Sequence, residues 1–276
     1  MDDTFADANL RREQLYDELA ASPAKELVGI VGSRSVSASR FRDQELWSLL
    51  LTLTAWRVGS EPIRTEPLTL RRRVNDNELQ RFQNLIEAET VIRIQARLAE
   101  NNVFGTPQGQ LEKFIQVDST DSELHARLAE LQKPVTYQDE RFGTLTFDRR
   151  ASWYAAEVKW QDETIALNVN VEKPDELNSA LEVAYALWNH ESTWHKRVVD
   201  YAIEHLLPLK NDTWLDDDGT GIFPEQFRDR MTLQSISVYP KGNFDFWHDD
   251  GDLFWGHSIQ VSGDLFNGLT RADIPG

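Results

Sequence analysis

The residues with the most evident chemistry lie close together near the C-terminus. Asp249, Asp250 and Asp252 surround a single glycine, and His257 follows shortly after. An Asp-Gly pair at the centre of a two-residue turn predicts a type I′ β-hairpin, which fixes the pairing of its strands. In that pairing Asp249 faces Asp252, and like charges placed opposite each other destabilise a strand pair. A bound cation or a basic side chain of a partner would relieve the repulsion. The alternative is a solvated turn whose carboxylates point apart.

The same pairing predicts an apolar and aromatic hairpin face. Its cross-strand pairs are His248 with Leu253, Phe246 with Trp255, and Phe244 with His257. His257 is then either a core histidine with one hydrogen-bond partner or a pocket histidine that titrates near the usual pKa of about 6.5. Imidazole and carboxylate groups both bind divalent metals. The candidate binding residues are Asp249, Asp250, Asp252, Trp255, His257 and Trp247, with Asp249 and Asp252 as candidate metal ligands.

Other motifs that carry chemistry are incomplete. Two histidines flank Glu191, but they are too far apart to share the helix face that a zinc motif of this kind requires. The acidic run 216–218 resembles a calcium loop, yet Thr220 takes the glycine position and Gln226 the position of the bidentate glutamate. The chain has no cysteine, and therefore no thiolate nucleophile, zinc–thiolate site or disulfide. We expect no cofactor.

Charge is distributed unevenly along the 276 residues. Residues 1–136 contain 17 basic and 21 acidic residues, a net of −4, whereas residues 137–276 contain 12 and 25, a net of −13. The second part would repel nucleic acid and anionic lipid and attract basic protein surfaces, although solubility alone is the alternative role of the charge. The sequence shows neither a long apolar run nor a secretory signal, so we expect a soluble cytoplasmic protein without membrane partners.

One basic patch stands against this acidic background. It consists of five arginines, Arg71, Arg72, Arg73, Arg93 and Arg97. On a barrel-like domain the patch could bind single-stranded nucleic acid, with Trp47 or Trp56 stacking on bases. The alternative, which the net charge of −17 favours, is that the arginines pair with nearby carboxylates such as Glu66, Glu87 and Glu89.

The elements of the first part indicate a small barrel. Alternating patterns predict strands over residues 27–31, 46–58, 66–74, 90–98 and 110–117. A short helix capped by Asn75 or Asp76 and a second helix over 121–132 are predicted, and the serine-rich segment 32–40 predicts a loop. This order favours a barrel-like or curled sheet, with the OB type as the named candidate.

The second part predicts a sheet with a long helical region. Strands are expected over residues 143–147, 153–160, 164–171, 232–239, 243–248 and 253–261. Pro174 begins a helical region that breaks near 189–193, and a short helix covers 224–230. The predicted fold class is α+β. An N-terminal helix (1–25) and a barrel-like domain (26–133) precede an acidic domain (134–276), whose antiparallel sheet packs against the helical region.

The C-terminal part also resembles a known family. The run from Asp249 to Ser258, Asp-Asp-Gly-Asp-Leu-Phe-Trp-Gly-His-Ser, is long and specific, and residues 231–236 and 244–246 accompany it. Over about residues 140–276 these motifs resemble the bacterial domain-of-unknown-function family numbered 2262, with a companion domain before it. That family has no established activity, so the resemblance implies a bacterial origin and no catalytic role.

Three functions remain as hypotheses. The acidic second part, with seven of the nine tryptophans and no complete catalytic motif, favours a non-catalytic module for a basic protein partner. An immunity protein that blocks a cationic nuclease toxin is one version of it. The second hypothesis is a metal-assisted hydrolase built on Asp249, Asp252 and His257. The third is single-stranded nucleic-acid binding by the N-terminal domain, which the net charge disfavours.

Overall fold

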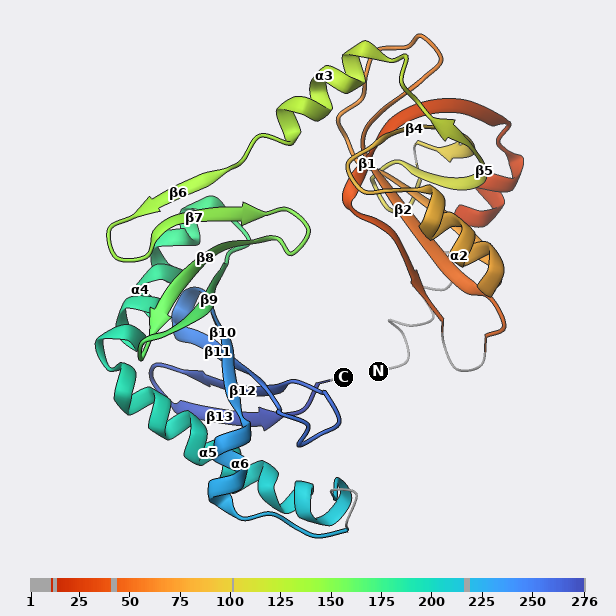
Figure 1. Cartoon of the computed structure of the whole chain (residues 1–276). Helices are drawn as coiled ribbons and strands as arrows, with labels where there is room; N and C mark the ends of the chain where they lie inside the picture. The colour runs from red at the N-terminus through yellow and green to blue at the C-terminus, as the bar shows by residue number, and fades with distance from the viewer. Residues whose placement is uncertain (1–10, 12–13, 41–43, 101, 216–218, 276) are drawn as a thin grey trace. The chain divides into compact units, whose positions relative to one another are not determined.

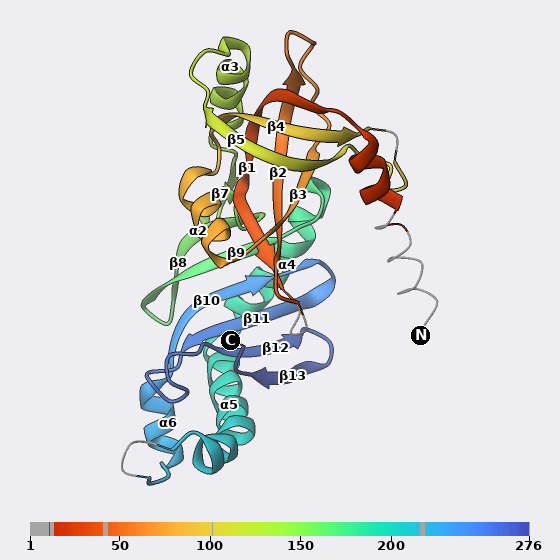
Figure 2. The same ribbon diagram turned by 90° about the vertical axis from the view of Figure 1, so that its right-hand side faces the viewer.

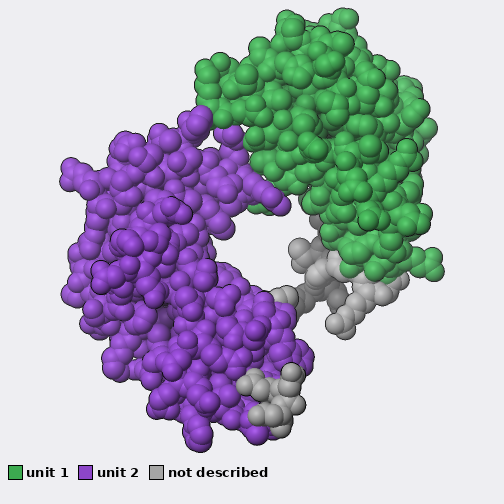
Figure 3. Space-filling model, viewed as in Figure 1, with its two compact units in different colours: residues 1–133 green, residues 134–276 purple. Residues whose placement is uncertain are grey.

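The computed structural model describes residues 11, 14–40, 44–100, 102–215 and 219–275. The chain divides between Lys133 and Pro134 into two compact units, unit 1 (Met1–Lys133) and unit 2 (Pro134–Gly276), which are shown in Figures 1 and 3. Both units combine strands and helices, which confirms the predicted α+β class. No helix in the described part of the chain is both long and apolar enough to cross a membrane.

Unit 1 is built around a ring of five strands. They are β1 (Ala24–Ser39), β2 (Trp47–Val58), β3 (Leu68–Val74), β4 (Val91–Ala99) and β5 (Gln108–Val117). The order β1-β2-β3-β5-β4 closes because β4 also pairs with β1. The β3–β5 pair is parallel and the other described pairs are antiparallel. Helix α2 (Asp76–Leu85) joins β3 to β4, and α3 (Ser122–Leu131) follows β5. This arrangement confirms the barrel-like prediction.

Alternation along the strands explains the core of unit 1. On β2, Leu49, Leu51 and Leu53 are completely buried, while Thr52 between them is exposed. Apolar side chains therefore fill the interior of the ring and polar ones face water. At the start of α2, the side chain of Asn75 accepts a hydrogen bond from the Glu78 N–H at 2.9 Å, so Asn75 is the cap and Asp76, the other predicted candidate, is the first residue of the helix.

Two expectations for unit 1 need correction. Residues 32–39, predicted as a loop, continue strand β1. The pairing with β2 shifts between Val31 and Val36, and Ser35 has a φ of 52°, so an irregularity absorbs the serine-rich segment within the strand. Residues 14–21 are helical, with Leu15 and Leu19 buried against Ala99, but residues 24–25 already belong to β1. Residues 1–10 and 12–13 of the predicted helix lie outside the described residues.

Unit 2 contains an eight-stranded sheet. Its strands in chain order are β6 (Thr136–Asp139), β7 (Gly143–Asp148), β8 (Trp153–Trp160), β9 (Glu163–Asn170), β10 (Thr232–Val238), β11 (Asn243–Asp249), β12 (Ile259–Asp264) and β13 (Gly268–Asp273). The spatial order is the reverse of the chain order, from β13 to β6. Among the described pairs only β9 and β10 run parallel, so the sheet is not wholly antiparallel as predicted.

Helices join the two parallel strands and cover one face of the sheet. The connection passes through a short 3₁₀ turn (Pro174–Glu176), α4 (Leu177–Asn189), α5 (Glu191–Thr213) and α6 (Pro224–Arg230). The break at His190 between α4 and α5 lies where a change of helix face was predicted. Figure 1 shows α4 and α5 along one face of the sheet, and Figure 2 views them behind strands β10 to β13.

The sheet of unit 2 has one apolar and one polar face. Leu167, Ile236, Phe246 and Val261 form a cross-strand row that is buried in the helix-facing core. The neighbouring row on the opposite face is polar and consists of Asn168, Ser237, Asp245 and Ser262. A period of two along each strand produces this separation. The core therefore lies on the side of α4 and α5.

Candidate functional site

The segment between β11 and β12 carries most of the predicted site residues, but it is not a two-residue hairpin. The observed cross-strand pairs are Phe244 with Gly263, Phe246 with Val261, and His248 with Ile259. The predicted register is therefore wrong, and the two strands are joined by a loop over residues 250–258. Asp249 and Asp252 therefore do not face each other across two strands. Asp249 is paired with Thr232 of β10, and Asp252 lies within the loop.

Asp250 explains why the loop is longer than predicted. Its side chain is 2% exposed. One carboxylate oxygen accepts a hydrogen bond from the Asp252 N–H at 3.2 Å, and the other accepts from Phe254 at 2.6 Å and Gly256 at 3.2 Å. An ionised acceptor with several N–H donors forms strong hydrogen bonds. Asp250 therefore organises the loop and is not free to bind a partner.

Two successive tight turns form this loop. The Leu253 N–H donates to the Asp250 carbonyl at 3.0 Å, and the His257 N–H donates to the Phe254 carbonyl at 3.2 Å. The central residues of both turns have positive φ, namely Gly251 (52°), Asp252 (63°), Trp255 (57°) and Gly256 (84°). Positive φ at both central residues is typical of type I′ turns. The first turn is therefore of the predicted kind but is centred one residue later than predicted, and the second turn was not predicted.

The second turn presents Trp255 to solvent. Its side chain is 71% exposed, and its ring packs on the half-buried Trp214, with centroids 4.7 Å apart. Trp214 also meets His257 edge-on at 5.5 Å and the buried Phe254 at 5.8 Å. The predicted residues Trp255 and His257 thus belong to one aromatic cluster, completed by Trp214 and Phe254. His257 lies beside Trp214 and not on the predicted strand face.

Two exposed carboxylates precede this tryptophan along the chain. Asp249 and Asp252 are both exposed, and the Asp249 side chain accepts a hydrogen bond from the Gly251 N–H at 2.9 Å. We refer to Asp249, Asp252 and Trp255 as the acidic–aromatic loop. Within the described ranges, no three His, Asp or Glu side chains are arranged to hold a metal, so the candidate ligands Asp249 and Asp252 have no third ligand there.

Two neighbouring residues of β11 have different surroundings. Trp247 is half-buried on the polar face of the sheet, paired across the strands with Ser235 and Gln260. It is therefore not part of the acidic–aromatic loop. His248 is 3% exposed on the core face, and burial lowers its pKa from 6.5 to about 3. His248 is thus the core histidine of this region, a role that the sequence allowed for His257.

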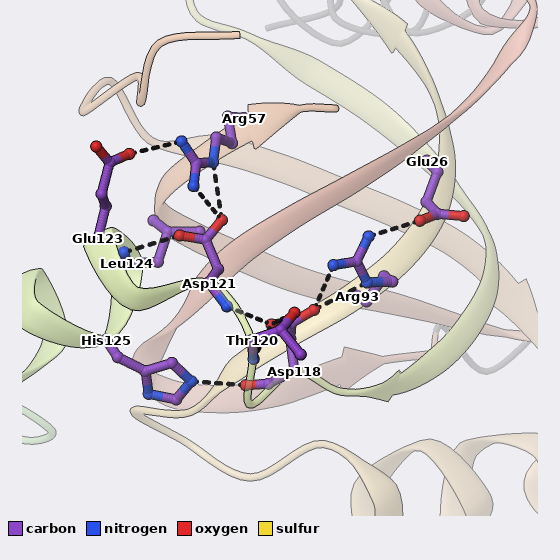
Figure 4. Close-up of polar contacts among 9 residues, drawn as sticks. All are labelled: Glu26, Arg57, Arg93, Asp118, Thr120, Asp121, Glu123, Leu124 and His125. Carbon is purple, nitrogen blue, oxygen red and sulfur yellow. Dashed lines mark hydrogen bonds and ion pairs between the residues drawn. The ribbon is translucent and has the colours of Figure 1, made fainter. Parts of the chain in front are cut away.

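The arginines of unit 1 contact groups of the same unit. In Figure 4 the Arg93 guanidinium donates to Asp118 at 2.5 and 2.8 Å and to Glu26 at 2.7 Å. Asp118 is completely buried and also accepts N–H bonds from Thr120 and Asp121, which hold its pKa at about 2 against its desolvation. This network ties the start of α3 to the ring.

The rest of the basic patch is engaged in a similar way. Arg72 contacts Glu78, Arg97 contacts Glu112, and the other two arginines donate to amide oxygens, Arg71 to Gln108 and Arg73 to Gln44. This agrees with the interpretation that the patch is internally paired. The partners differ from the glutamates named from the sequence, because strand pairing brings together residues that are distant along the chain.

Two family models match the chain. Residues 139–274 match a family described as an uncharacterized protein conserved in bacteria (DUF2262), and residues 11–131 match a domain of unknown function (DUF7021). The first match confirms the resemblance seen around Asp249–Ser258, and the second is its companion domain. Comparisons with curated proteins and with solved structures found no match.

Proposed function

We propose that this chain, which joins a DUF7021 domain to a DUF2262 domain, is a non-catalytic binding protein for a basic protein partner. The acidic–aromatic loop of unit 2 is the contact surface in this proposal. The observation that carries it is Trp255, which is 71% exposed at a φ of 57°.

The conformation of Trp255 is costly for a residue without a binding role. Left-handed backbone costs a non-glycine residue about 1–2 kcal/mol. Leaving a large apolar side chain in water also forgoes about 1.5–3 kcal/mol of burial free energy. Such strain concentrates at ligand-binding sites, where the surroundings hold it in place. Here the buried Asp250 carboxylate fixes the loop through three backbone N–H groups, so Trp255 is preorganised for contact.

The chemistry of the loop suits a cationic side chain. An arginine or lysine of the partner can lie over the indole face of Trp255, a contact worth about 0.5–1 kcal/mol when exposed and about 2 or more when desolvated. The negative charges of the exposed Asp249 and Asp252 carboxylates would also attract this cationic side chain. At longer range the net charge of −13 in residues 137–276 would speed association with a basic protein.

An immunity-type role is the narrower form of this proposal. A basic nuclease toxin would present the arginines and lysines that the loop requires, and its cationic site would be covered by an acidic protein. We place this activity in the cytoplasm, in keeping with a fold that uses no disulfide. The hydrolase hypothesis receives less support, because Asp249, Asp252 and His257 do not form a metal-holding group. The nucleic-acid hypothesis has the barrel-like ring of unit 1 in its favour, but the arginines of the basic patch already contact acceptors of unit 1.

The test is a titration with short arginine-rich and lysine-rich peptides, followed by fluorescence anisotropy at about 50 and about 300 mM salt. We expect Trp255→Ala to weaken binding about tenfold, which corresponds to about 1.4 kcal/mol. Phe266→Ala is the matched control, because Phe266 is 85% exposed in the same unit but outside the loop. Equal binding by the two variants, or the absence of binding at low salt, would contradict the proposal.

A further inference from the structure

A second feature of unit 2 lies at the other end of β11, where the parallel strands β9 and β10 finish. After Asn170 the chain leaves β9 towards α4, while after Val238 it turns tightly into β11. Chain segments that diverge from the carboxyl ends of parallel strands leave a crevice, which is a common place for ligands in sheets of this kind. Unit 2 has a cavity of about 810 Å³ at this point.

The size and lining of this cavity suit a small molecule. Small-molecule pockets in proteins have volumes of about 300–1,000 Å³ and combine apolar walls with a few polar groups. The apolar wall consists of Phe147, Ala151, Val171 and Pro240. The polar residues are Ser152, Asn170, Glu172, Glu176, Tyr239 and Lys241. All of them belong to unit 2.

One polar atom of the lining has no partner. The side-chain amide nitrogen of Asn170 is closed to bulk water and makes no hydrogen bond within the described residues. A buried donor without an acceptor costs about 1–3 kcal/mol. An acceptor oxygen supplied by a ligand would satisfy it once the Asn170 side chain turned its amide group into the cavity. Lys241 lines the same cavity, and its ammonium group would favour the oxygen further if that oxygen belonged to a carboxylate.

The same cavity also has groups that suit a cation. Glu172 is an exposed carboxylate in the lining. Glu176 is half-buried, and one of its oxygens accepts N–H bonds from Glu172 at 3.1 Å and Lys173 at 3.3 Å. These bonds fix the Glu176 carboxylate at the beginning of the helical connection. A ligand that offers an ammonium group to Glu172 and Glu176 would complement their charge.

A rigid wall stands beside these groups. The Tyr239 hydroxyl donates to Asp245 at 2.8 Å, and the Ser262 hydroxyl donates to the other oxygen of Asp245 at 2.6 Å. Tyr239 is thus tied to β11 and β12, and both its burial and the Asp245 carboxylate raise the pKa of its hydroxyl. The phenol stays neutral and acts as a wall of the cavity, so we assign it no part in acid–base chemistry.

We propose that this cavity binds a small zwitterion of the free amino acid class, with its ammonium group at Glu172 and Glu176 and its carboxylate at Asn170 and Lys241. The apolar wall formed around Phe147 and Pro240 would receive an apolar side chain. This site is separate from the acidic–aromatic loop, since the cavity lies before the start of β11 and the loop follows its end.

Calorimetric titration of the full chain with free amino acids tests the proposal. L-leucine and L-phenylalanine are the principal probes, and N-acetyl-L-leucine and L-leucinamide are the matched compounds that lack one charge each. We expect the free amino acids to bind and each derivative to bind about tenfold or more weakly. Glu172→Gln and Asn170→Ala should weaken binding to a similar extent, whereas Glu163→Gln, at the opposite end of β9, should not.

Three results would overturn the proposal. The first is that no free amino acid gives heat above background at millimolar concentration. The second is that the acetylated or amidated compound binds as well as the free amino acid. The third is unchanged affinity in Glu172→Gln, an exposed substitution that the fold tolerates, together with unchanged affinity in Asn170→Ala. Trp255→Ala should leave amino acid binding intact, so failure of this inference is distinguishable from failure of the partner-binding proposal.

Discussion

Single residues of the β11–β12 region show how burial changes the role of a side chain. Asp249, Asp250 and Asp252 are nearly adjacent, yet two are exposed and one is fixed by three backbone N–H groups. The two exposed carboxylates remain available to a partner, whereas the buried Asp250 carboxylate holds the loop backbone in place through its hydrogen bonds. Residue type alone therefore indicates the chemistry of this segment, and the division of roles depends on the fold.

His248 provides a prediction at the same scale. Its folded-state pKa of about 3 lies below its ordinary value of 6.5, so on acidification the unfolded chain takes up the proton first. The contribution of His248 to stability is therefore complete above pH 6.5 and is lost as the pH falls towards 3. Urea unfolding followed by tryptophan fluorescence, from about pH 7 to about pH 4.5, should show a loss approaching about 1.4 kcal/mol per pH unit from this residue.

The variant His248→Leu isolates this effect from the titration of carboxylates. It should flatten the pH dependence of unfolding over this range, whereas His205→Gln, a change at an exposed histidine of α5, should not. If His248→Leu and the parent chain lost stability equally on acidification, a neutral buried His248 would be excluded.

At the scale of elements, the loop over residues 250–258 decides the register between β11 and β12. Gly251 is required there for two reasons, its φ of 52° and the Arg230 carbonyl, which would lie 2.4 Å from an added Cβ. The Gly251 carbonyl also accepts a hydrogen bond from the Arg230 side chain at 2.8 Å. The loop is thereby joined to the end of α6, so its two turns and this helix form one assembly.

Gly256 is the matched control for a prediction on this loop. It also has positive φ, at 84°, but no heavy atom lies within 4 Å of an added Cβ. Gly256→Ala should therefore destabilise the protein by about 1 kcal/mol, through backbone strain alone. Gly251→Ala should cost more, about 2 kcal/mol or above, because the Arg230 backbone must also move. Chemical denaturation measures both, and equal losses would show that the Arg230 contact has no energetic role.

The elements that the sequence predicts well are those with local causes. The cap at Asn75, the helix over 224–230 and the strand over 153–160 depend on neighbouring residues and occur as predicted. The hairpin register failed because the Asp250 carboxylate bonds to N–H groups of residues further along the loop. Strand β13 was not predicted, since its place is set by pairing with β12. The cavity beside Asn170 likewise depends on β9 and β10 being parallel, which no local pattern indicates.

At the scale of the whole molecule, charge separates the two parts of the chain. Unit 1 uses its arginines in pairs with its own carboxylates and amides, whereas residues 137–276 carry 25 acidic against 12 basic residues. A protein with this distribution should associate with basic surfaces through its second part, at a rate that falls with salt. The acidic–aromatic loop would then convert this general attraction into a specific contact.

The most direct test of partner binding is a differential capture experiment in a lysate of the source organism. The parent chain, Trp255→Ala and Phe266→Ala are used as baits at low salt, and the bound proteins are quantified by mass spectrometry. We expect Trp255→Ala to lose a basic protein that the parent chain and Phe266→Ala retain, and we expect salt to release that protein. Identical captured sets for all three baits, or the loss of only acidic proteins, would contradict a role for the acidic–aromatic loop in binding a basic partner.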